Sequence, residues 1–100
     1  MITFIIPTVN RPQLGRAIDS LYAQTSEEWK AIIVYDGIKP SEDYSSNKIK
    51  TIQIEKSGIT RAHNGQAGLV RNVGISQADT EWVGFLDDDD ILDKNYVKLL

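Results

Sequence analysis

Four consecutive aspartates, Asp87 to Asp90, follow directly on the apolar run of residues 82–86 in this chain of 100 residues. Their carboxylates repel one another, and burying them without a counter-charge would cost much free energy. Carboxylate oxygens are the ligands that Mg²⁺ and Mn²⁺ prefer, and such an ion removes the repulsion and can bridge to substrate phosphates. The alternative is a solvated loop whose negative charge favours the start of a helix. The buried strand that precedes the aspartates favours the metal site.

Three other polar residues are candidates for a site. Asp36 ends a second apolar run and precedes Gly37, a pair that most often forms only a turn. Arg71 lies in LVRNVGI, where a snorkelling surface arginine and a guanidinium aimed at phosphate or at an acidic partner are both open interpretations. His63, the only histidine, is interpreted as a loop residue rather than as a ligand or base.

Composition excludes several classes of site. The chain has no cysteine, which excludes disulfides, zinc–thiolate centres and thiol catalysis. The phosphate-binding patterns G-x-x-x-x-G-K-[ST] and strand-linked G-x-G-x-x-G are missing, and the acidic run lacks the Gly and Glu of an EF-hand loop. A net charge of −3, with eleven scattered basic residues, argues against nucleic acid as a partner.

Length and hydropathy bound the organisation of the chain. One hundred residues, 41% of them hydrophobic, suffice for one domain with one core, spanning 1–100. The start, MITFIIP, has no basic region typical of a signal peptide, and no apolar stretch approaches the ~20 residues that span a bilayer. We therefore expect a cytoplasmic protein without a membrane span.

Short apolar runs rich in β-branched residues predict four strands, at Ile2–Ile6, Trp29–Tyr35, Ile49–Ile54 and Trp82–Leu86. The more polar third run is predicted to lie nearer a sheet edge. A first helix is predicted between the first two strands, because apolar residues recur at the spacing of one helix face, at Leu14, Ala17, Ile18, Leu21 and Tyr22.

Two further helices are predicted. One covers Gln66–Ala78, although Gly68 and Gly74 weaken it by about 1 kcal/mol each. Asp93 is predicted to cap a last helix with one apolar face, formed by Leu92, Tyr96, Leu99 and Leu100.

The resulting order β-α-β-β-α-β-α predicts an α/β fold, with a mainly parallel, Rossmann-like sheet flanked by helices on both faces. Ligands of such sheets bind beyond the carboxyl ends of the strands. Residues 8–11, Asp36 and the aspartate run all follow strands, so topology places them on that ligand edge.

Three stretches in this order resemble the nucleotide-sugar-binding half of GT-A-fold glycosyltransferases, in particular the inverting family 2. FIIPTVNRPQLGRAIDSLYAQT resembles the opening strand, loop and helix of that family, and IIVYDG its second strand with the base-binding Asp. GLVRNVGISQADTEWVGFLDDDDIL resembles its Arg-Asn-x-Gly helix, followed by a strand and the D-x-D motif. The likeness covers nearly the whole chain.

The resemblance implies a UDP-sugar donor. Thr8, with Pro7 and Val9, would line the base and ribose, and Arg11 would lie at the mouth of that pocket. Asp36 would accept a hydrogen bond from the base, typically uracil.

The resemblance also implies roles for the charged residues of the third stretch. Arg71 would anchor the base-side carboxylate or a phosphate, and Asp87 and Asp88 would approach the ribose and the donor sugar. Asp89 would bind the Mn²⁺ or Mg²⁺ that bridges the diphosphate, and Asp90 would support the loop or cap the next helix.

The chain departs from the family in length. Family members are usually more than twice as long, and their second half supplies the acceptor site and the general base, neither of which is identified here.

Two functions stay open: a minimal metal-dependent glycosyltransferase with weak transfer or donor hydrolysis, and a non-catalytic UDP-sugar-binding module or subunit that needs a partner. A receiver domain fits poorly, because its acidic cluster would follow the first strand. The apolar end, with Val97, Leu99 and Leu100, also allows a homo-oligomer.

Overall fold

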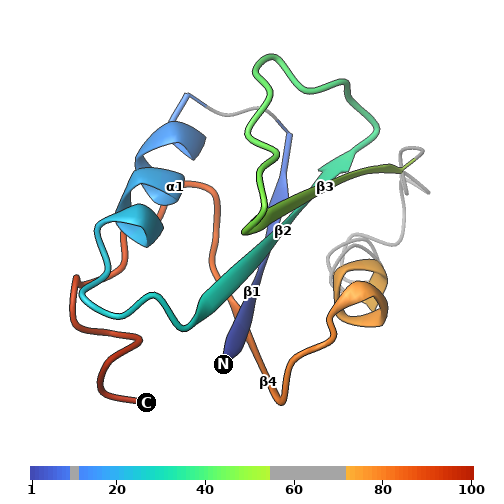
Figure 1. Ribbon diagram of the computed structural model, residues 1–100. Helices are drawn as coiled ribbons and strands as arrows, with labels where there is room; N and C mark the ends of the chain where they lie inside the picture. Colours follow the sequence, from blue (N-terminus) through green and yellow to red (C-terminus); the bar gives the residue numbers. More distant parts are fainter. Residues whose placement is uncertain (10–11, 55–71) are drawn as a thin grey trace.

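The computed structural model describes residues 1–9, 12–54 and 72–100, and these form one four-stranded parallel sheet (Figure 1). The strand order is β3-β2-β1-β4. The strands are β1 (Ile2–Thr8), β2 (Trp29–Asp36), β3 (Ile49–Ile54) and β4 (Trp82–Phe85). The predicted α/β class with a parallel sheet is confirmed, as is the edge position of β3.

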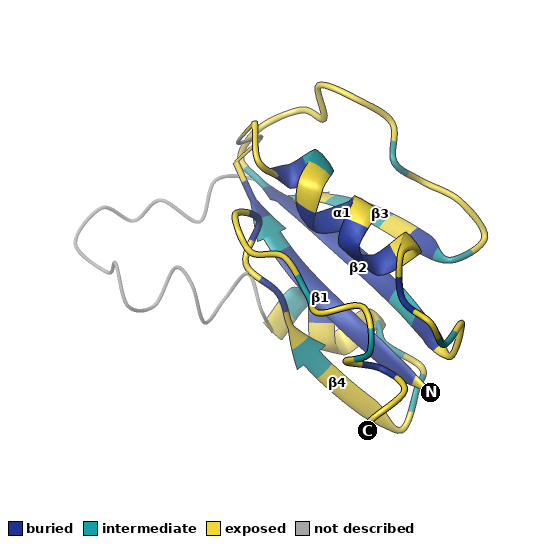
Figure 2. Cartoon of the chain, turned by 90° about the vertical axis from the view of Figure 1, so that its left-hand side faces the viewer, coloured by how far each residue is buried: buried dark blue, intermediate teal, exposed yellow. Residues whose placement is uncertain are grey.

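Helix α1 (Leu14–Tyr22) covers one face of the sheet. Its predicted apolar stripe is buried except for Tyr22, which is 53% exposed. The buried part packs against β-strand residues of alternating position such as Phe4, Ile6 and Ile33. Because β1 and β2 lie in the middle of the sheet, almost all of their residues are buried (Figure 2). This explains why the sequence of these strands reads as continuous apolar runs.

A second helix, residues 72–77, covers the opposite face and lies across the sheet from α1 (Figure 1). Val73 packs there on a cluster formed by Ile5, Ile32 and Val34. Gly74 makes the close approach possible, because an added Cβ would overlap Ile5 Cγ2 and lie 3.2 Å from Ile5 Cδ1. Residues 66–71 of the predicted helix lie outside the described residues.

The last predicted helix is wrong, since residues 94–99 form consecutive turns. The side chain of Gln24, at the end of α1, donates to the Asp93 carbonyl at 2.6 Å and accepts from the Val97 N–H at 3.0 Å. The Thr25 N–H donates to the Lys94 carbonyl at 2.8 Å. Backbone groups that a helix would pair internally are therefore bonded to the end of α1 instead.

The apolar face predicted for that helix is divided as a result. Val97 is buried in the α1-side core, and the Tyr96 ring lies 5.9 Å from that of Phe4, centroid to centroid. Leu99 and Leu100 are 81% and 69% exposed. The Asp93 carboxylate accepts the Asn95 N–H at 2.8 Å, a local turn bond in place of the predicted helix cap.

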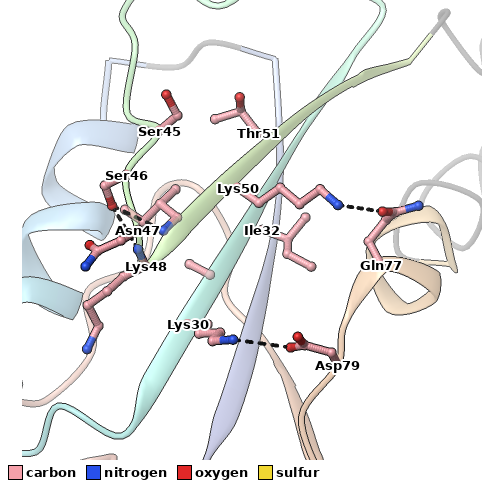
Figure 3. Close-up of a pocket in the computed structure, with 12 residues that line it drawn as sticks. Lys30, Ile32, Ser45, Ser46, Asn47, Lys48, Lys50, Thr51, Gln77 and Asp79 are labelled. Atoms are coloured by element: carbon pink, nitrogen blue, oxygen red, sulfur yellow. Dashed lines mark hydrogen bonds and ion pairs between the residues drawn. The ribbon is translucent and has the colours of Figure 1, made fainter.

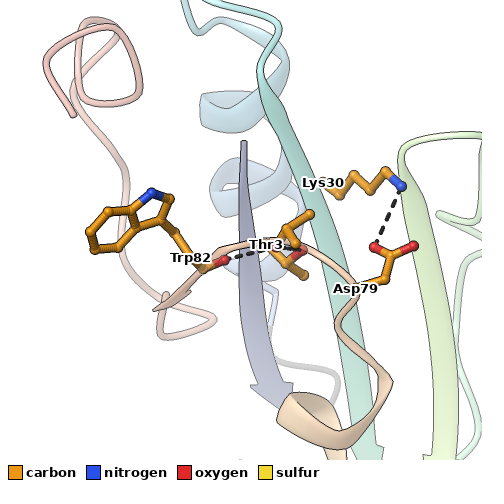
Figure 4. A network of polar contacts seen from close by, with 5 residues as sticks. Thr3, Lys30, Asp79 and Trp82 are labelled. Carbon is orange, nitrogen blue, oxygen red and sulfur yellow. Dashed lines mark hydrogen bonds and ion pairs between the residues drawn. The ribbon is translucent and has the colours of Figure 1, made fainter.

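Polar contacts fix the start of β4 at the amino ends of the strands (Figure 4). The Thr80 hydroxyl donates to the Trp82 carbonyl at 2.8 Å, so the Thr3 hydroxyl is the donor in the 2.6 Å bond that joins it to Thr80. Lys30 and Asp79 form an ion pair at 3.5 Å. These contacts hold residues 79–81, which directly precede β4, against β1 and β2.

Strand β4 forms the other edge of the sheet among the described residues and carries exposed apolar side chains. Trp82 is 67% exposed and Phe85 is 49% exposed.

Within the described ranges, no helix has both the length and the apolar character needed to cross a membrane. The cytoplasmic location expected from the sequence stays a prediction.

We predict that Gly74→Ala destabilises the protein by about 1–3 kcal/mol, because the fully buried Ile5 side chain cannot move away from the added methyl group. Gly15→Ala is the matched control, since its Cβ would meet only the Tyr44 hydroxyl at 3.4 Å. The control should be neutral or gain up to ~1 kcal/mol in helix propensity. Urea unfolding measures both, and equal effects of the two changes would contradict the tight packing at Gly74.

Candidate functional site

The carboxyl ends of three strands bring the predicted site residues to one edge of the sheet. Thr8 ends β1 and pairs with Tyr35 of β2, so Asp36 lies one residue beyond that pair. On the other side of β1, β4 leads directly into the aspartate run. Since neighbouring strands lie about 4.8 Å apart, Thr8, Asp36 and the aspartates are close neighbours.

The four aspartates form a single tight turn. The Leu86 N–H donates to the Ile5 carbonyl at 3.0 Å and so extends the β1–β4 ladder by one bond. The Asp90 N–H then donates to the Asp87 carbonyl at 3.0 Å, with Asp88 and Asp89 between them. An aspartate at the first position is typical of such turns. We call residues 87–90 the acidic turn.

The acidic turn has an inner and an outer side. Asp88 is only 6% exposed, and its Oδ2 accepts the Thr8 hydroxyl proton at 2.8 Å. Asp87, Asp89 and Asp90 are exposed, and one carboxylate oxygen of each lies within 4.8 Å of the others. The turn therefore separates one buried carboxylate from three clustered, outward-facing ones.

The outer carboxylates fit a hard divalent cation. An Mg²⁺ ion holds its ligands at about 2.1 Å, so two of its ligand oxygens lie at most about 4.2 Å apart. The separation of up to 4.8 Å in the acidic turn is close to that span, and rotation of exposed side chains can close the difference. An all-oxygen donor set favours Mg²⁺ or Mn²⁺ over zinc or copper. Asp89 was the ligand expected from the sequence; the positions of Asp87 and Asp90 make them further candidates for the same ion.

The segment after β2 forms the turn that the sequence suggested. Gly37 has a φ of 72°, which favours glycine, and its N–H donates to the Ile54 carbonyl at 2.9 Å. This bond joins the ends of β2 and β3 and holds Asp36 at the strand terminus, half-buried beside Thr8. The role of Asp36 toward a base stays a prediction.

Pro7 and Val9 lie on either side of Thr8. Pro7 is half-buried in β1, where its missing N–H would face β4, but the β1–β4 ladder has already ended at Ile5 and Leu86. Proline is therefore tolerated in this central strand. Val9 is exposed at the edge. Arg11, Arg71 and His63 lie outside the described residues.

A lysine-lined pocket of about 480 Å³ opens at the amino ends of β2 and β3, away from the acidic turn (Figure 3). Its three ammonium groups are already engaged: Lys30 with Asp79, Lys50 with Gln77 at 2.7 Å, and Lys48 with the Glu27 carbonyl at 2.6 Å. Lys50 and Lys30 thus tie the sheet to the end of the 72–77 helix. These lysine contacts stabilise the fold, and the pocket adds no group to the site.

The model of the family described as glycosyl transferase family 2 matches residues 3–100. The chain belongs to this family. The resemblance read from the sequence is thereby confirmed, and the parallel sheet with helices on both faces is the sheet of a GT-A fold.

Two curated relatives have bacterial sources. The glycosyltransferase GlyA of Streptococcus pneumoniae serotype 4 is 31% identical over 102 residues, which cover 99% of this chain and 14% of that protein. The poly(ribitol-phosphate) β-N-acetylglucosaminyltransferase TarP of Staphylococcus aureus is 32% identical over 101 residues, which cover 91% of this chain and 29% of TarP. This chain thus spans less than a third of either relative. That its 100 residues form one domain without the acceptor-binding half stays a prediction.

Solved structures of S. aureus TarS match the fold closely. The structure of TarS 1–349 superposes with a TM-score of 0.74 at 28% identity, covering 97% of this chain and 30% of the other. The same protein in complex with UDP superposes with a TM-score of 0.73. A related chain of this fold therefore binds UDP.

We predict that Mn²⁺ or Mg²⁺ stabilises this protein, by about 2.7 kcal/mol at an ion concentration 100 times the dissociation constant. Asp89→Asn should lose most of this gain, because it removes one of the three outer carboxylates. Asp93→Asn is the control: it removes an exposed charge nearby, while the amide oxygen can still accept the Asn95 N–H. Thermal unfolding with and without the ion measures the effect, and an equal gain in both variants would argue against the acidic turn as the site.

Proposed function

We propose that this chain binds a UDP-sugar through Asp36 and the acidic turn, with Mn²⁺ or Mg²⁺, and acts as a minimal glycosyltransferase with weak transfer or donor hydrolysis. The observation that carries the proposal is the meeting of Thr8, Asp36 and three clustered carboxylates on the ligand edge of a family 2 domain. The UDP complex of TarS, which shares this fold, supports the nucleotide.

Each strand end would contact a different part of the donor. Asp36 would accept a hydrogen bond from the N3–H of uracil, while Pro7, Thr8 and Val9 line the base and ribose. Arg11 would lie at the mouth of this pocket, and Arg71 would contact a phosphate or the carboxylate on the base side. In the acidic turn, Asp87 and Asp88 would lie toward the ribose and sugar, and Asp89 would hold the metal.

The acidic turn alone cannot hold a diphosphate, because its carboxylates and the phosphates repel one another. A divalent ion, when bound, offsets both charges and stabilises the diphosphate as a leaving group. The outer carboxylates would hold that ion at the end of β4, and their rigid attachment to β1 would fix its distance from the base pocket. Binding of donor and metal should consequently be strongly coupled.

We predict that this protein binds UDP more tightly in Mn²⁺ than in EDTA and prefers UDP to CDP. Cytosine offers an acceptor where uracil has the N3–H, so it cannot make this N3–H bond to Asp36. Asp36→Ala should weaken UDP about tenfold or more, the usual cost of losing a hydrogen bond to a charged group, and should remove the preference over CDP.

Calorimetric titration measures these affinities, with Asp19→Ala as the control because Asp19 is an exposed residue of α1. A parent protein that binds neither UDP nor CDP would contradict the proposal. An Asp36→Ala variant that binds UDP like the parent would remove only the base assignment.

A second candidate function is a binding module that needs a partner for transfer. An open groove of about 650 Å³ beside β4 favours it, with apolar side chains including Trp82, Tyr96 and Leu100 in its wall. Exposed apolar surface of this kind marks interaction sites. A second copy of this chain is one partner that could cover it and give the homo-oligomer suggested by the sequence.

Turnover separates the two candidates. We predict slow release of UDP from UDP-glucose or UDP-galactose by the isolated protein, because a placed general base contributes about 10²- to 10⁴-fold and none is identified here. Asp89→Ala should abolish the release. A coupled assay for free UDP measures the rate; turnover at the ~1–10³ s⁻¹ of ordinary enzymes would contradict the expectation, and no release at all would favour the binding module.

A further inference from the structure

Two threonines of β1 hold the two ends of β4 by hydrogen bonds of their hydroxyl groups. At the amino end, the Thr3 hydroxyl bonds to Thr80 at 2.6 Å, before β4 begins. At the carboxyl end, the Thr8 hydroxyl donates to Asp88 at 2.8 Å, across 80 positions of sequence. Both threonines are buried, Thr3 at 1% and Thr8 at 3% exposure. Only the second bond holds the acidic turn.

We propose that Thr8 is a positioning residue for the metal site: its hydroxyl holds Asp88 inward, and this presents Asp87, Asp89 and Asp90 outward as a group. The inference rests on the proposed function, since the acidic turn must bind an ion for the positioning to matter. It also changes the roles that the sequence suggested for Thr8 and Asp88. The Thr8 hydroxyl donates its proton to Asp88, and Asp88 supports the ion site without being its ligand.

The physical reason lies in the cost of a buried charge. A carboxylate that is 6% exposed needs hydrogen-bond donors, and a bond from a hydroxyl to an ionised acceptor is among the stronger kinds. Loss of that donor weakens the hold on the inward position of Asp88 and makes its rotation toward water more favourable. Because Asp88 lies between Asp87 and Asp89 in one tight turn, its rotation would add a fourth charge to the outer group and change the direction of its neighbours.

Binding of Mn²⁺ alone tests this, because no nucleotide is present and a direct contact of Thr8 with UDP cannot contribute. Thr8→Val keeps the shape and removes the donor, and we expect it to weaken Mn²⁺ about tenfold. Thr8→Ser restores a hydroxyl and should bind within about threefold of the parent. Electron paramagnetic resonance of free Mn²⁺ gives the dissociation constants.

Thr3→Val is the matched control: it removes a buried hydroxyl bond from the same strand, at the far end of β4. Its Mn²⁺ affinity should stay within about twofold of the parent, even where it lowers the melting temperature as much as Thr8→Val does. Equal losses of affinity in the two variants would reduce Thr8 to a structural role and overturn the inference.

Asp88→Asn keeps the test decisive if Thr8→Val does not fold. An asparagine oxygen can still accept from Thr8, so we expect Mn²⁺ affinity within about threefold of the parent, whereas Asp89→Asn loses it. A loss in Asp88→Asn as large as in Asp89→Asn would make Asp88 a ligand and overturn the inference. A parent protein that binds no Mn²⁺ would instead defeat the metal-dependent function itself, and the inference with it.

Discussion

The parallel pairing of β1 with β4 is the constraint on which the site depends. It runs from Ile2 and Trp82 to Ile5 and Phe85, and one further bond joins Leu86 to Ile5. Residues near the two ends of the chain are thereby brought into contact, and the acidic turn emerges beside Thr8. Since β1 also pairs with β2 over its whole length, the same strand sets the distance from the acidic turn to Asp36.

Packing on both faces of β1 makes this placement rigid. The α1 side is filled by side chains such as Phe4 and Leu14, and the other side by Ile5 against the 72–77 helix, where Gly74 lets the two come close. The bonds from Gln24 to the chain after the acidic turn hold its other end. A turn with four adjacent charges would otherwise spread, because repulsion favours its open forms. The fold thus supplies the free energy that keeps these charges together until a cation offsets them.

Much of the fold and of the candidate site could be predicted from the sequence. Continuous apolar runs such as IIVY belong to strands buried on both faces, so the parallel sheet and its ligand edge followed directly. The inward direction of Asp88 could not be predicted, because four identical residues carry no pattern and the side that each faces depends on turn geometry and on Thr8. The prediction of a last helix was wrong because its apolar spacing suits turns as well. Gln24 also bonds the Asp93 carbonyl and the Val97 N–H, which a helix would pair with each other. The roles expected of Arg11 and Arg71 stay predictions.

The acidic turn is where we propose that metal and diphosphate meet. Anomalous diffraction at the manganese edge, from crystals grown with Mn²⁺ and UDP, tests it most directly. We predict one strong peak within about 2.0–2.6 Å of outer carboxylate oxygens of Asp87, Asp89 or Asp90, with Asp88 still bonded to Thr8. UDP bound at the strand ends without a metal peak there, or a peak at another edge of the sheet, would contradict the account.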